Sequence, residues 1–99
     1  MARVNRIDTQ VAELLAIQAL GYLASEPEQR GRFLALTGLG PESIRTAAHD
    51  PRFLAGVLDH VAGDEALLTA FADHAQVKPA RVMEARAALG SRDWERETP

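Results

Sequence analysis

Apolar residues recur along most of the chain at spacings of three and four, which is the period of an α-helix. No stretch alternates apolar and polar residues for long enough to predict a strand. Glycine, proline and aspartate interrupt the pattern at short intervals and divide it into helices. The predicted helices span about residues 8–24, 25–37, 41–48, 51–62, 65–75 and 79–90. The sequence therefore predicts an all-α fold, a compact single-domain bundle of five or six short helices.

Composition supports this prediction, since 18 Ala and 12 Leu stand against only 6 Val and 3 Ile. Ser25 and Glu28 have the spacing of a capping box at the start of the second helix. Gly90 is expected to end the last helix. We therefore expect a helical domain over residues 1–90 and a flexible C-terminal tail over residues 91–99.

The predicted core consists of the apolar residues that share one face of each helix. These residues are Val11, Leu14, Leu15, Phe33, Leu34, Ile44, Phe53, Leu54, Val57, Val61, Leu67, Leu68, Phe71, Val82 and Leu89. The first helix carries more apolar surface than one interface needs, because Leu20 and Leu23 lie off its main stripe. Either the second helix covers these two leucines, or they form an exposed patch and a possible partner surface. We expect intramolecular burial, and hence a monomer rather than a homodimer.

The net charge and the cysteine content exclude several classes of function and site. The net charge of −3 gives no globally basic surface, and the absence of cysteine excludes disulfides, thiol catalysis and cysteine-based zinc sites. The longest apolar run is well short of the ~18 residues that a membrane span needs. The first residues contain no apolar segment of the kind found in signal peptides. We expect a cytoplasmic protein that does not enter a membrane.

Side chains that could support catalysis or metal binding are sparse. His49, His60 and His74 do not have the spacing of a zinc-ligand pair on one helix face, and their places near predicted helix ends suit a capping role. No serine lies in a nucleophile elbow. We therefore expect no enzymatic activity and no cofactor.

A helix–turn–helix pattern is the most specific local motif, and it covers Phe71 to Val82. Gln76 occupies the position where such motifs usually have a glycine in the left-handed conformation. The cations that could contact nucleic acid are Lys78, Arg81 and Arg86. The face of the second helix that would read bases offers mainly alanine and glutamate, so nucleic-acid binding by the 71–89 hairpin is the alternative reading and not the first.

Four segments together resemble a known family. They are residues 16–24, 32–39, 50–59 and 64–68, within a similarity that extends from about Thr9 to Gly90. They resemble the small, mostly alphaproteobacterial proteins of domain-of-unknown-function family 3572. The resemblance implies a helical bacterial protein and supplies no activity, ligand or catalytic residue. A non-enzymatic module that binds another protein is the function we expect.

Overall fold

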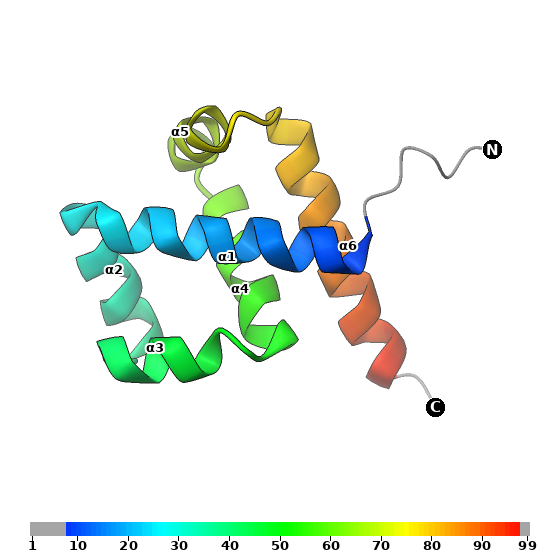
Figure 1. Cartoon of the computed structure of the whole chain (residues 1–99), viewed down its shortest axis with the longest axis horizontal. Helices are drawn as coiled ribbons and strands as arrows, with labels where there is room; N and C mark the ends of the chain where they lie inside the picture. Colours follow the sequence, from blue (N-terminus) through cyan, green and yellow to red (C-terminus); the bar gives the residue numbers. More distant parts are fainter. Residues whose placement is uncertain (1–7, 98–99) are drawn as a thin grey trace.

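Six α-helices follow one another in the computed structural model, which describes residues 8–97, apart from the side chains of residues 41 and 91–97. They are α1 (Thr9–Ser25), α2 (Pro27–Thr37), α3 (Pro41–Ala47), α4 (Pro51–Ala62), α5 (Glu65–Ala75) and α6 (Pro79–Glu97) (Figure 1). The described range contains no strand. The prediction of an all-α, single-domain bundle is confirmed.

Aspartates begin three of the helices. The side chains of Asp8, Asp50 and Asp64 accept hydrogen bonds from the backbone N–H groups of Gln10, Arg52 and Leu67, at 3.0, 2.9 and 3.2 Å. These bonds satisfy N–H groups that have no partner within the first turn. Gly38 ends α2 in the left-handed conformation, with φ of 73°. Local sequence thus explains where most of the helices begin.

Two helix ends differ from the sequence prediction. Ser25 is the last residue of α1, and its hydroxyl donates to the carbonyl of Tyr22 at 2.8 Å, so the expected capping box is absent. Gly90 does not end α6, which continues to Glu97. Among the described glycines only Gly38 has the positive φ of a left-handed helix cap. The flexibility expected for residues 91–99 stays a prediction.

The centre of the fold is formed by α1, α4 and α6, each of which packs against the other two. Figure 1 shows α1 crossing in front of α4 and α6, with α5 above it and α2 and α3 at the lower left. The short helix α3 packs only weakly against the other helices. The radius of gyration is 13.3 Å, close to the roughly 13 Å of a compact domain of this length.

The core is apolar throughout and contains no buried polar or charged residue among the described side chains. Most of the predicted core is confirmed as buried. Fully buried members are Leu15, Phe33, Leu54, Val57, Val61, Leu67, Phe71, Val82 and Leu89. Leu34, Ile44, Phe53 and Leu68 are partly buried at its edge.

The predicted inward face of α1 is wrong at two of its three core residues. Val11 and Leu14 are 40% and 62% exposed, although both were expected in the core. The face that packs on α4 and α6 instead consists of Ala12, Leu15, Ala16, Ala19, Leu20 and Leu23. Small alanine side chains allow the central helix to approach its neighbours closely, and that close contact decides the orientation of α1. The larger apolar residues of the opposite side are consequently left at the surface.

Candidate protein-binding surface

Leu20 and Leu23, the partner surface that the sequence suggested, are buried at 8% and 1% exposure. They lie beside Phe33 and Leu34 of α2 and Ile44 of α3, around a cavity of only about 30 Å³. The second helix therefore covers them, as the preferred alternative expected. These two leucines form part of the core and offer no surface to a partner.

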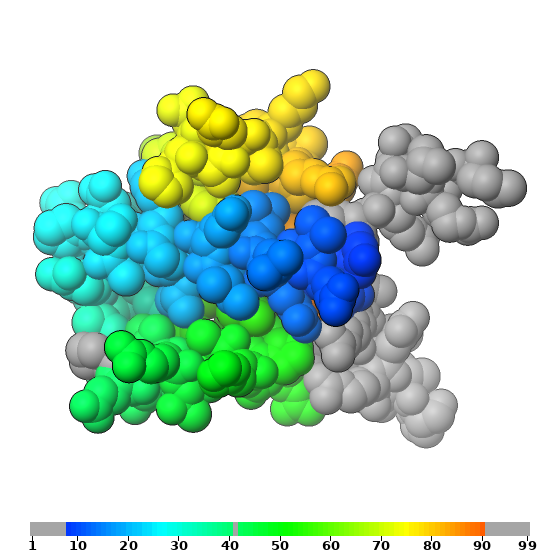
Figure 2. Space-filling view, in the orientation of Figure 1, coloured from blue at the N-terminus to red at the C-terminus, as the bar shows by residue number. Residues whose placement is uncertain are grey.

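An exposed apolar stripe lies on the opposite side of α1. We call it the α1 outer face and define it by Gln10, Val11, Leu14, Ile17, Gln18 and Gly21, all of them exposed. Its large apolar members, Val11, Leu14 and Ile17, have exposures of 40%, 62% and 44%. Positions 10, 14, 17 and 21 are separated by four, three and four residues, which aligns them along one side of a helix. Figure 2 shows this side of α1 uncovered between α5 and α3.

The α1 outer face is also free of charge. Glu13 is the only charged residue between Thr9 and Ser25, and it is not a member of the outer face. Charged residues make up 25% of the whole chain, so this surface differs from the rest. Contiguous exposed apolar surface and depletion of charge are both typical of the centre of a protein–protein interface.

A hollow of about 470 Å³ adjoins the outer face where α1 meets the end of α5. Gln18, Gly21 and Tyr22 of α1 line one side of it, and His74 and Gln76 line the other. The rings of Tyr22 and His74 lie against each other, with centroids 4.9 Å apart. Gly21 contributes no side chain, and a Cβ placed there would meet nothing within 4 Å. The hollow is therefore open to an incoming side chain next to the apolar stripe.

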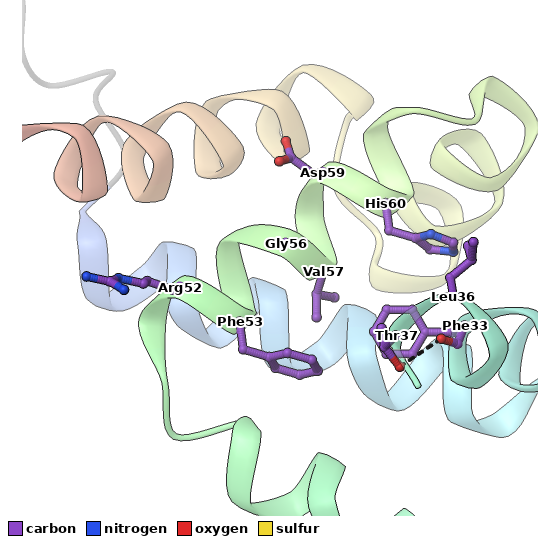
Figure 3. Close-up of a pocket in the computed structure, with 9 residues that line it drawn as sticks. All are labelled: Phe33, Leu36, Thr37, Arg52, Phe53, Gly56, Val57, Asp59 and His60. Carbon is purple, nitrogen blue, oxygen red and sulfur yellow. Dashed lines mark hydrogen bonds between the residues drawn. The ribbon is translucent and has the colours of Figure 1, made fainter. Parts of the chain in front are cut away.

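A second depression lies between α2 and α4 and has a volume of about 480 Å³ (Figure 3). Phe33, Leu36 and Phe53 supply its apolar walls, and His60 lies beside Leu36 at one end. The rings of Phe33 and His60 meet in a T-shaped arrangement with centroids 5.3 Å apart. Its size suits a small molecule or a few side chains. It has apolar walls but shows no convergent set of polar groups that would specify one ligand.

His60 is the described side chain whose electrostatics depart most clearly from the ordinary. Its Nε2 atom is buried and has no hydrogen-bond partner in the structure. Burial lowers the pKa of His60 below its usual 6.5, and the nearby Arg32 guanidinium lowers it further, whereas Asp64 opposes the shift. The imidazole is consequently held neutral and serves as an aromatic packing group against Phe33.

The cations of the predicted helix–turn–helix are not assembled into a basic surface. Arg81 lies 3.3 Å from the carboxylate of Glu84, and Arg86 forms an ion pair with Asp59 of α4. Lys78 is exposed just before α6. Gln76 does adopt the left-handed conformation, with φ of 60° and ψ of 43°, so the turn between α5 and α6 has the conformation that the motif predicts. The turn is present, but each of the two arginines is paired with an acid.

Two further searches of the described part of the chain gave no site. No group of three or more His, Cys, Asp or Glu side chains there could hold a metal ion. None of the helices searched is both long enough and apolar enough to cross a membrane.

A family model described as "Protein of unknown function (DUF3572)" matches residues 9–92. The chain belongs to this family. The DUF3572 match begins at the first residue of α1 and extends into α6, so the α1 outer face and the adjoining hollow both lie within it. No curated protein and no solved structure matches the chain.

The sequence contained one signal for the outer face that we interpreted in the opposite sense. Val11 and Leu14 are apolar residues at helical spacing, and helical amphipathicity normally directs such residues inward. The scarcity of charge in α1, where Glu13 alone is charged, was the more informative observation. When a helix has no charged face, its sequence does not indicate which side is exposed to solvent. In the structure the side with Leu14 is exposed.

Proposed function

We propose that this protein is a non-enzymatic module that binds another protein through the α1 outer face. The observation that carries the proposal is the exposure of Leu14 and Ile17 on a helix side without charge. Removing such side chains from water on binding is favourable by about 25 cal/mol per Å² of apolar surface. The family resemblance adds the expectation that the protein acts in the bacterial cytoplasm.

The proposal is tested by site-specific photocrosslinking in the cells that make the protein. Leu14 is replaced by the photoreactive residue p-benzoylphenylalanine, and Leu36 of α2 is replaced in the same way as the matched control. Leu36 is an apolar residue of equal size and is 69% exposed, and it lines the depression between α2 and α4 instead of belonging to the α1 outer face. Irradiation is followed by electrophoresis and detection of the protein.

We expect a discrete crosslinked species from the Leu14 position and none from the Leu36 position. Equal crosslinking at both positions would indicate general adhesion of exposed apolar residues and would overturn the proposal. Absence of any adduct from Leu14, with the protein folded and the photoreactive group intact, would also overturn it. The mass of the adduct is recorded in each case, because it identifies the kind of partner considered below.

A further inference from the structure

The α1 outer face contains both a projecting side chain and an open space. Leu14 is 62% exposed, and the space above Gly21 continues into the hollow lined by Gln18 and Tyr22. The two positions are seven residues apart, which is about 20° short of two full helical turns. They therefore point in nearly the same direction and are separated by about 10 Å along the helix axis.

This arrangement is complementary to itself. When two α1 helices lie antiparallel about a two-fold axis near Ile17, Leu14 of each copy comes to lie over Gly21 of the other copy. Gln10 then lies opposite Ser25, and the two Ile17 side chains meet beside the axis, which passes between positions 17 and 18. In a two-fold interface each contact of this kind occurs twice, so the projecting leucine fills the open space in both directions.

Building on the proposed function, we propose that the partner of the α1 outer face is a second copy of this chain, packed with its α1 antiparallel to the first. Charge at the contact does not oppose this occupant. The chain has a net charge of −3, so two copies repel each other over most approaches, whereas the outer face brings no like charges together. The only charged residue of α1, Glu13, is not a member of that face.

The earlier expectation of a monomer depended on the burial of Leu20 and Leu23, and that burial occurs. The outer face is the other side of the same helix, and its exposure provides a second surface through which the chain could form a dimer. A 17-residue helix is about 25 Å long and 10 Å wide, which gives a footprint of about 250 Å² per copy, smaller than the interface of a stable dimer. The expected complex is therefore a reversible dimer whose population rises with protein concentration.

The first experiment is sedimentation equilibrium of the purified full chain over a range of concentrations. The 10.7 kDa chain is expected to approach twice that mass as concentration rises. Leu14→Glu should weaken the dimer at least tenfold, because two leucines lose their burial at once. Gly21→Leu, which fills the open space, should have a similar effect. The matched controls are Leu36→Glu and Gly31→Leu in α2, where Gly31 likewise has open space around it, and they should leave the dimer unchanged.

A parent chain that stays monomeric at the highest concentration would overturn this inference. A dimer that is insensitive to Leu14→Glu and Gly21→Leu would overturn it equally. Circular dichroism establishes that each variant keeps its helix content and a cooperative melting transition. The photocrosslinking above separates the two proposals, since an adduct of another mass would sustain the protein-binding function while it overturns the second copy as partner.

The second experiment determines orientation and does not depend on variants that disrupt the interface. Because the chain has no cysteine, a single cysteine can be placed at Ile17 or at Gln10. In the antiparallel pair the two Ile17 positions meet beside the axis, whereas the two Gln10 positions are about 21 Å apart along the helix, beyond the reach of a disulfide. Oxidation should link Ile17→Cys into dimers and leave Gln10→Cys monomeric. Linkage of Gln10→Cys alone, or of neither variant, would overturn the arrangement.

Discussion

Leu14 and Leu23 belong to the same helix and have opposite surroundings. Leu14 is 62% exposed, whereas Leu23 is 1% exposed and packs between α1 and α2. They are nine positions apart, which rotates the side chain by about 180° around the helix axis. The orientation of α1 can therefore be tested with two substitutions of identical chemistry.

Leu23→Ala should lower the free energy of unfolding by about 2–5 kcal/mol, because it removes buried methyl groups and leaves a cavity. Leu14→Ala should change it by no more than about 0.5 kcal/mol, as for other exposed positions. Urea denaturation at a low protein concentration, followed by circular dichroism, measures both values. A large loss at Leu14 with a small loss at Leu23 would show that α1 is rotated to the face predicted from the sequence.

His60 gives the fold a defined response to acid. Its pKa is lower in the folded state than the 6.5 of the unfolded chain, so the unfolded state binds more protons as the pH falls through this range. The contribution of His60 to the free energy of unfolding should be constant above pH 6.5. It should decrease as the pH falls from 6.5 through the lowered pKa.

The measurement compares urea denaturation of the parent and of His60→Leu between pH 7.5 and pH 5. The parent should lose stability over this interval, and the variant should lose less, because leucine keeps the apolar contact with Phe33 and carries no titrating group. Arg32 and Asp64, the charged groups that act on His60, are present in both proteins. An identical slope in the two proteins would contradict the assignment of the response to His60.

At the scale of the helix, the connection from α5 to α6 contains the one described non-glycine residue with positive φ. Gln76 ends α5 with φ of 60°, a conformation that costs a residue with a Cβ roughly 1–2 kcal/mol. The backbone N–H of Val77 donates to the carbonyl of Ala72 at 2.9 Å across this turn, which closes the helix end. The strained conformation thus directs the chain from α5 into α6.

Gln76→Gly should therefore stabilise the protein by about 0.5–1 kcal/mol, after allowance for the greater freedom of glycine in the unfolded chain. The same substitution at Gln18, within α1, should instead destabilise it by about 0.5–1 kcal/mol. Thermal denaturation of the two variants beside the parent measures the difference. A lower melting temperature for Gln76→Gly would indicate that the glutamine side chain contributes an interaction that outweighs the strain.

The elements also show how far the sequence determines the fold. The side chains of Asp8, Asp50 and Asp64 fix three helix starts through local hydrogen bonds, and a proline is the first residue of each of the other three helices, so the starts were predictable. The register of α4 was predictable as well, because Leu54, Val57 and Val61 form its only apolar stripe. The orientation of α1 was not, since alanine and leucine surround it and the choice depends on how closely α4 and α6 can pack. The candidate surface was missed for the same reason.

At the scale of the whole molecule, three helices that are distant in sequence build one core. Val57, Leu58 and Val61 of α4 are fully buried, and Val82 and Ala85 of α6 lie against them with no exposed surface. On the other side α1 packs on both helices and turns its outer face to solvent (Figure 1). The interior of the protein is thus completed by its first and last helices together, and the same placement of α1 leaves its outer face available to a partner.

The packing of the first helix on the last also constrains how the protein is made. Ribosomes add about 5–20 residues per second, so about 1–5 s separate the synthesis of Ala62, at the end of α4, from that of Leu89 in α6. During this time α1 and α4 exist without the helix that covers them, and their apolar faces are open to chaperones or to neighbouring nascent chains. The core can close only when α6 has emerged, so we expect folding to be completed only after α6 has left the ribosome.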